Sequence, residues 1–201
     1  MQTQWYGDKR DVVKWATLVH LCTERKLKGV IQVPFRNDAE FDHALSIDER
    51  PHKFPKVVWR HFRDLQHIKA LGEQAGLPIE IVPDQFRHDQ RDAYIDNVCR
   101  TLTRFPRRPK AVFLDPDTGI APKTAGVRHV RLEEIKKLWG HLNKGDWLVL
   151  YQHASRSKDW RSAQKRRFAN ACGGASVRSY DCKAIAHDVV FFCAEKSSQE
   201  C

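Results

Sequence analysis

The sequence of 201 residues has no apolar run that approaches the ~18 residues of a membrane-spanning helix. Its first residues lack the basic and apolar regions of a secretory signal. The six cysteines form no C-x-x-C pair and no zinc-type spacing with histidine, and several lie within apolar patterns, where a free thiol acts as a small hydrophobic group. We therefore expect a soluble cytoplasmic protein with reduced cysteines and no membrane partner.

Common ligand-binding and catalytic motifs are absent as well. No G-x-G-x-x-G follows an expected strand, and G-x-x-x-x-G-K-[ST] does not occur, which argues against dinucleotide and P-loop sites. The hydrolase motif G-x-S-x-G is also missing. Ser155 has His153 close in sequence, but two such residues do not make a catalytic triad.

Positive charge is abundant. Lysine and arginine number 35 and the acids 25, which gives a formal net charge of +10. This excess favours a polyanionic partner, and nucleic acid, RNA or DNA, before a membrane. The basic side chains that we expect to contact phosphates lie in and before an expected helix at 159–171; they are Arg156, Lys158, Arg161, Lys165 and Arg166.

The segment from 111 to 120, AVFLDPDTGI, carries the strongest local signal. A short apolar run of this kind predicts a strand buried on both faces. Pro116 cannot donate to a sheet and favours an extended conformation for the residue before it, so the strand should end at Asp115. Asp115 and Asp117 would then lie at the carboxyl end of a central strand, where open α/β sheets bind ligands. An ordinary turn is the alternative, because Asp, Pro and Gly all favour turns.

The rest of the chain alternates between helical and strand patterns. Helices are expected at 12–22, 57–75, 89–103, 132–144 and 159–171, and a long loop at 36–55. Strands are expected at 30–33, 79–82, 111–115, 147–151, 176–182 and 189–194. This alternation predicts a single α/β domain over 1–201, with a Rossmann-like, mostly parallel sheet, helices on both faces and a C-terminal antiparallel strand pair.

Parallel strands end along one edge of a sheet. That edge should therefore gather side chains from four separate strands, namely Phe35, Asp84, Asp115, Asp117, Gln152 and His153. Acids and a histidine at several strand ends exceed what turns require, and a shared cleft would explain them together.

Three segments, GDKRDVVKW at 7–15, FLDPD at 113–117 and GDWLVLY at 145–151, occur in an order that resembles class I S-adenosylmethionine-dependent methyltransferases. In particular, they resemble the adenine-N6 methyltransferases that act on large-subunit ribosomal RNA. In that family an Asp-Val-Leu-Lys-His segment opens a helix over the cofactor, and an Asp-Pro-Pro-Tyr loop accepts hydrogen bonds from the adenine amino group of a flipped base.

The resemblance implies specific roles. S-adenosylmethionine would bind near Asp11, Lys14, Asp84 and Phe35, and the catalytic residues would be Asp115, Asp117 and His153. The sequence departs from the family pattern in two places. Pro34-Phe35 stands where that family has a glycine-rich loop, and Asp117-Thr118 replaces Pro-Tyr.

Two other hypotheses stay open. The first is a metal-dependent nuclease or phosphoryl-transfer enzyme, because Asp84, Asp115, Asp117 and His153 are hard ligands of the kind that Mg²⁺ or Mn²⁺ accepts. The second is a non-catalytic nucleic-acid-binding protein with a degenerate methyltransferase fold.

Overall fold

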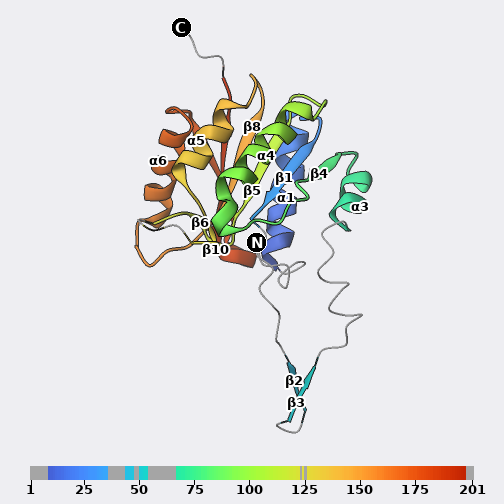
Figure 1. Ribbon diagram of the computed structural model, residues 1–201, viewed down its shortest axis with the longest axis vertical. Coiled ribbons are helices and arrows are strands. Elements are labelled where there is room, and N and C mark those ends of the chain that lie inside the picture. The colour runs from blue at the N-terminus through green and yellow to red at the C-terminus, as the bar shows by residue number, and fades with distance from the viewer. Residues whose placement is uncertain are drawn as a thin grey trace.

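A six-stranded sheet forms the centre of the protein, in the strand order β4-β1-β5-β8-β10-β9 (Figure 1). The computed structural model describes residues 9–35, 44–47, 50–53, 67–122, 124 and 126–197. The strands are β1 (Val30–Pro34), β4 (Ile79–Ile81), β5 (Ala111–Asp115), β8 (Trp147–His153), β9 (Val177–Cys182) and β10 (His187–Glu195). Strands β4, β1, β5 and β8 are parallel, and β10 runs antiparallel to both of its neighbours. The predicted Rossmann-like fold class is confirmed.

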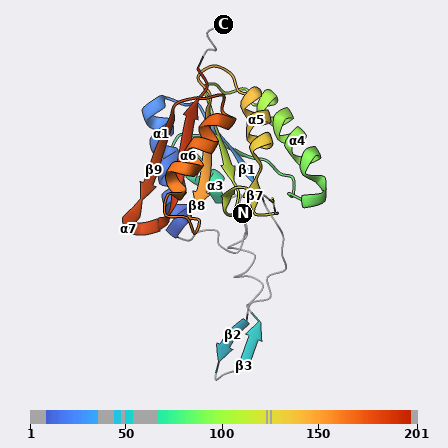
Figure 2. The ribbon, with the colours of Figure 1, turned by 90° about the vertical axis from the view of Figure 1, so that its left-hand side faces the viewer.

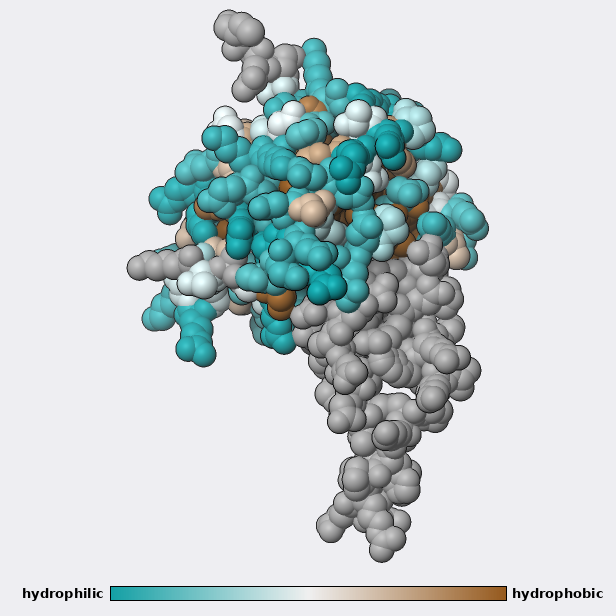
Figure 3. All heavy atoms as spheres, in the orientation of Figure 1, coloured by the Kyte–Doolittle hydropathy of each residue, from teal (hydrophilic) through white to brown (hydrophobic). Residues whose placement is uncertain are grey.

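Helices cover both faces of this sheet (Figures 1 and 2). One face packs against α1 (Lys9–Arg25) and α3 (His67–Gln74), and the other against α4 (Arg91–Arg104), α5 (Leu132–Gly140) and α6 (Trp160–Ala171). Because both faces are covered, β1 and β5 are buried along their whole length and are mostly apolar, with Gln32 and Asp115 as the buried polar exceptions. In Figure 3, the solvent side of α4, α5 and α6 is mostly hydrophilic, as amphipathic helices require.

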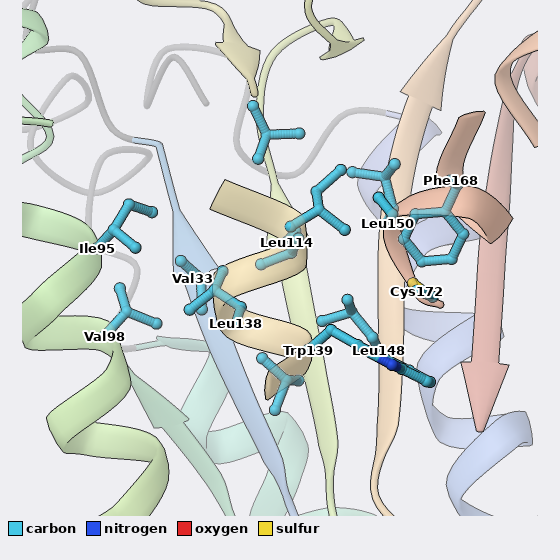
Figure 4. Close-up of a cluster of buried hydrophobic side chains, with 14 of the residues drawn as sticks. Val33, Ile95, Val98, Leu114, Leu138, Trp139, Leu148, Leu150, Phe168 and Cys172 are labelled. Atoms are coloured by element: carbon cyan, nitrogen blue, oxygen red, sulfur yellow. The ribbon is translucent and has the colours of Figure 1, made fainter. Parts of the chain in front are cut away.

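Side chains alternate between two cores. Val33, Leu114 and Leu150 point toward α4, α5 and α6, where they meet apolar side chains of those helices (Figure 4). Phe113 and Tyr151 point the other way, into the core under α1. This alternation follows from the period of two in a strand, and it decides which end-of-strand residues share a face.

The sheet register aligns the strand ends. Pro34 pairs with Asp115 across β1 and β5, and His153 pairs with Val189 across β8 and β10. From β1 the chain crosses outward to β4 and then returns to β5 on the other side of β1. The strand order therefore reverses between β1 and β5, which is the position where open α/β sheets place their ligands.

Some local predictions were wrong. The segment 36–55, predicted as a loop, contains an antiparallel hairpin of β2 (Ala44–Ile47) and β3 (Arg50–Lys53). Its strands, ALSI and RPHK, contain neither a sustained apolar run nor a cluster of β-branched residues, so no strand signal was visible. Of the helix expected at 57–75, the part at 57–66 lies outside the described residues.

Short elements were also missed. They are the paired strands β6 (Gly119–Ile120) and β7 (His129–Val130), the 3-10 helix η2 (His88–Gln90), and the helix α7 (Lys183–Ala186) between β9 and β10. Elements of two to four residues are too short to show periodicity.

None of the helices in the described part of the chain is both long and apolar enough to cross a membrane.

Candidate functional site

A buried group of charged and polar side chains lies beside the end of β5. Asp115 points to the α1 face, as does Phe113 two residues before it, and only 1% of Asp115 is exposed. Its Oδ2 accepts hydrogen bonds from Gln32 Nε2 at 2.9 Å and from Lys14 Nζ at 3.1 Å. Lys14 also donates to Asp11 Oδ1 at 2.5 Å. The structure thus brings together Asp11, Lys14 and Asp115, which the sequence predicted for one site, and adds Gln32.

Among the residues that the structure describes, Lys14 is the cation that contacts Asp115. Burial by itself would lower the pKa of Lys14, but the carboxylates of Asp115 and Asp11 outweigh burial and hold that pKa above its ordinary value. The rings of Phe113 and Tyr151 lie 5.9 and 5.5 Å from Nζ and contribute cation–π attraction. The ammonium therefore stays charged within the core between α1 and the sheet.

The end of β1 is closed by aromatic side chains. Phe35 is fully buried, with its ring centroid 5.0 Å from that of Phe86 and 5.8 Å from that of Tyr94. Tyr94 donates its hydroxyl to the carbonyl of Pro34 at 2.6 Å. Burial, together with the carboxylates of Asp84, Asp115 and Glu134, raises the pKa of Tyr94 well above its ordinary value. Phe35, predicted to contact the cofactor, is thus placed in the core.

Asp84 follows β4, the neighbour of β1, and is exposed. Its carboxylate accepts a hydrogen bond from the amide of Asn97 on α4. Unlike Asp115, it presents an acceptor to solvent at the carboxyl edge of the sheet.

The loop after Asp115 is held by Gln152 at the end of β8. Gln152 Nε2 donates to the carbonyls of Thr118 at 3.0 Å and His153 at 2.8 Å, and its Oε1 accepts from the backbone N–H of Ile120 at 2.9 Å. Gly119 adopts a φ of +106°, which favours glycine. Gln152, expected only as a member of the edge, thus fixes the backbone on which Asp117 lies.

A second support comes from the other side of this loop. The backbone N–H and hydroxyl of Thr118 both donate to the carbonyl of Arg128, at 3.1 and 2.9 Å. Asp117 Oδ2 lies 3.9 Å from Arg128 Nε, and the side chain of Asp117 is 14% exposed. Buried Arg91 forms two hydrogen bonds with Glu134, at 2.7 and 2.8 Å, and donates to the carbonyl of His129 at 2.9 Å. The loop that follows Asp115 is therefore held in place by hydrogen bonds from Gln152 on one side and to Arg128 on the other.

His153 belongs to a separate ionic group on the same edge. Its Nε2 lies 3.0 Å from Asp188 Oδ2 at the start of β10, and Arg10 donates to the same oxygen at 2.5 Å. Burial by itself would raise the pKa of Asp188, but the hydrogen bonds and charge of Arg10, with His153, lower it below its ordinary value. Sequence reasoning missed Arg10 and Asp188, which lie 178 residues apart, because only the packing of α1 against the sheet brings them together.

The expected phosphate-binding residues fall into two groups. Arg156 and Lys158, in the loop after β8, and Arg166 on α6 are exposed, and Lys165 is half-buried. Arg161 is engaged within the protein: it donates to Asp181 at 2.6 Å and to the carbonyl of His187 at 2.9 Å. The exposed group follows His153 directly and so begins at the edge that carries the acids.

The expected metal ligands do not converge. Within the residues that the structure describes, no three His, Cys, Asp or Glu side chains lie close enough to hold one metal ion. Asp115 is occupied by Lys14 and Gln32, and His153 contacts Asp188 instead. Asp84 lies at the end of β4, two strands away from β5. The described geometry thus gives the metal-dependent hypothesis no ligand set.

Comparisons with known proteins add little. No family model matches the sequence, and no curated protein matches it. A crystal structure described as a DUF574 family protein from Streptomyces avermitilis MA-4680 is similar at 10% sequence identity and a TM-score of 0.41. That similarity covers 94% of this chain and 82% of the other. A function must therefore come from the chemistry of the site.

Proposed function

We propose that this protein is a methyltransferase-like enzyme that binds S-adenosylmethionine at the carboxyl edge of its sheet and acts on nucleic acid. The observation that carries the proposal is the reversal of strand order between β1 and β5, with Pro34 and Asp115 paired across it. Ligands of open α/β sheets bind outside the strand ends at such a reversal. Two acids lie beside this position. Asp84 follows β4, on one side of β1, and is exposed, whereas Asp117 follows β5, on the other side, and is partly exposed.

The residues at this edge fit the nucleoside part of S-adenosylmethionine. Asp84 follows the strand next to β1, and its exposed carboxylate can accept hydrogen bonds from ribose hydroxyls, as acids at this place in Rossmann-like sheets do. Asn97 orients that carboxylate. When bound, the cofactor would supply a sulfonium-bound methyl group, whose carbon a nucleophile of the substrate attacks while the C–S bond breaks and the neutral thioether leaves. Asp11, Lys14 and Phe35, all buried, would shape the site from beneath and not contact the cofactor directly.

The loop after β5 would hold the substrate. Asp115 anchors the start of this loop through Lys14 and Gln32, and Gln152 fixes its backbone up to Ile120. Asp117, which is partly exposed, would accept a hydrogen bond from an amino group of the substrate. A carboxylate held in place before the substrate arrives needs little reorganisation, which is the main contribution that a fixed polar group makes to catalysis.

A nucleic-acid substrate fits the charge. Arg156 and Lys158 are exposed and follow His153 by only a few residues, and the chain carries a net charge of +10. A phosphate backbone bound by Arg156 and Lys158, in the loop after β8, would place a base near Asp117. Such contacts position a strand without reading its sequence.

A non-catalytic nucleic-acid-binding protein is the second candidate. The observation that favours it is the burial of Asp115, which is only 1% exposed and whose carboxylate is already engaged by Lys14 and Gln32. In this case the basic loop would bind nucleic acid, and S-adenosylmethionine would not bind.

The deciding experiment uses S-adenosylmethionine with a labelled methyl group and pools of RNA, single-stranded DNA and duplex DNA. The enzyme hypothesis predicts label transfer to one of these pools, with a loss on the order of 100-fold in Asp117→Asn. Asp159→Asn, at an exposed position before α6, is the matched control and should keep the wild-type rate. Nucleic-acid binding without any label transfer would refute the enzyme hypothesis and support the second candidate.

A further inference from the structure

The ammonium group of Lys14 lies between two carboxylates. Nζ is 2.5 Å from Asp11 Oδ1 and 3.1 Å from both carboxylate oxygens of Asp115. The side chains of Lys14, Asp11 and Asp115 are only 6%, 9% and 2% exposed. The three groups thus form a compact ionic contact that solvent hardly reaches.

This contact joins two elements at the proposed site. Asp11 and Lys14 lie one turn apart on α1, and Asp115 ends β5. Gln32 on β1 donates to Asp115 Oδ2 and so fixes the plane of the carboxylate from the neighbouring strand. A lysine ammonium is a compact point charge with three donors, which suits a position between two acids.

We infer that Lys14 is the resident cation of this site and the positioning residue for Asp115. Its ammonium lies between two carboxylates, a position that a divalent ion occupies in the carboxylate sites of metalloproteins. Lys14 therefore acts through Asp115 on the loop that carries Asp117. The inference depends on the proposed function only for the role of that loop in binding substrate.

A specific ligand class follows from this geometry. If the side chain of Lys14 is shortened to alanine, the buried carboxylates of Asp11 and Asp115 lose the ammonium that lies between them, and a cavity takes its place. Like charges at such a distance do not both stay ionised without compensation, so the cavity should take up a small cation. Because two separate acids accept hydrogen bonds from Nζ, the cation should carry several N–H donors, as a primary alkylammonium ion does.

The test is chemical rescue of Lys14→Ala, and the melting temperature of this variant is the quantity measured. We expect a loss on the order of 10 °C relative to wild type, because one partner of a buried ion pair is removed. Ethylammonium chloride should restore part of that loss, and tetramethylammonium chloride, which has no N–H donor, should not. Lys14→Met fills the cavity with an uncharged chain and should show no rescue. Equal effects of the two salts on Lys14→Ala, or rescue by Mn²⁺ in place of ethylammonium, would overturn the inference.

A second pair of variants covers the case in which Lys14→Ala does not fold. Lys14→Met with Asp115→Asn removes both the cation and the acid that it neutralises, so the double variant should melt at a higher temperature than Lys14→Met alone. An equal or lower melting temperature would overturn the inference. Lys26→Ala, at an exposed position just after α1, is the matched control. None of these measurements uses methyl transfer, so their failure and the failure of the proposed function can be told apart.

Discussion

The side-chain amide of Gln152 occupies the space that a side chain at Gly119 would need. A Cβ atom on residue 119 would overlap with Oε1, Cδ and Nε2 of Gln152. Gly119 is therefore required twice, by its φ of +106° and by the close approach of an amide that holds the loop after Asp115. The loop geometry at the proposed substrate site depends on this pair.

Gly119→Ala should accordingly destabilise the protein by roughly 2–3 kcal/mol, from backbone strain and the clash with Gln152. The free energy of unfolding in urea measures the loss. Adding Gln152→Ala should relieve the clash, so the two changes should cost less together than the sum of their separate costs. Gly140→Ala is the control, because a Cβ there meets no atom within 4 Å. Equal losses at the two glycines would contradict the proposed role of the pair.

Asp115→Asn should cost about 3 kcal/mol in unfolding free energy, because the buried ammonium of Lys14 then keeps only Asp11 as a charged partner. Urea denaturation of the variant beside Asp159→Asn, which changes an exposed acid, measures the difference. The exposed control should stay within about 0.5 kcal/mol of wild type. A value for Asp115→Asn in that same range would show that the buried charge cluster does not stabilise the fold.

Asp188→Asn should change how stability depends on pH. The pKa of Asp188 is lowered in the folded protein from its ordinary value of 3.8, so its ionic contacts stabilise the fold above that value. We expect the variant to be about 2 kcal/mol less stable at neutral pH, because a neutral amide accepts weaker hydrogen bonds from Arg10 than the carboxylate does. The difference from wild type should shrink as the pH falls below 3.8 through the folded-state pKa. Unfolding free energies between pH 2.5 and 7 measure this, and a difference that is independent of pH would refute it.

The substitution of Arg156 and Lys158 by glutamate should weaken nucleic-acid binding and its salt dependence. Each lost contact to a single strand should reduce the slope of log K against log salt by about 0.7. The matched control is Lys26→Glu with Lys28→Glu, which changes the same charge in the exposed residues between α1 and β1. Fluorescence anisotropy at several salt concentrations gives both slopes. If the two double variants lost affinity equally, binding would follow net charge and not the loop after β8.

The parallel sheet could be predicted because its strands are buried on both faces. VIQV, AVFL and WLVLY lie between helical patterns and turn residues, and each became a strand at the expected place. The edge that gathers Asp84, Asp115 and His153 followed from this alternation alone. The hairpin β2–β3 could not be predicted, since ALSI and RPHK carry no such apolar signal.

The side-chain contacts at the carboxyl edge of the sheet could not be predicted from the sequence, for a different reason. Whether Asp115 faces solvent or α1 depends on which side of the sheet it points to, and the partner of His153 depends on the register of β10. These are long-range relationships that residue types and spacing do not encode. The resemblance to methyltransferases implied one site for Asp11, Lys14 and Asp115, but the contacts that Lys14 makes with the two acids are visible only in the structure.

Isothermal titration of the protein with S-adenosylmethionine tests the central claim most directly, because the claim is that the carboxyl edge near Asp84 binds this cofactor. The account predicts saturable binding to wild type, an affinity roughly tenfold or more weaker for Asp84→Ala through the loss of hydrogen bonds to a charged acceptor, and an unchanged affinity for Lys26→Ala. No saturable binding to wild type, or equal affinities of wild type and Asp84→Ala, would contradict it.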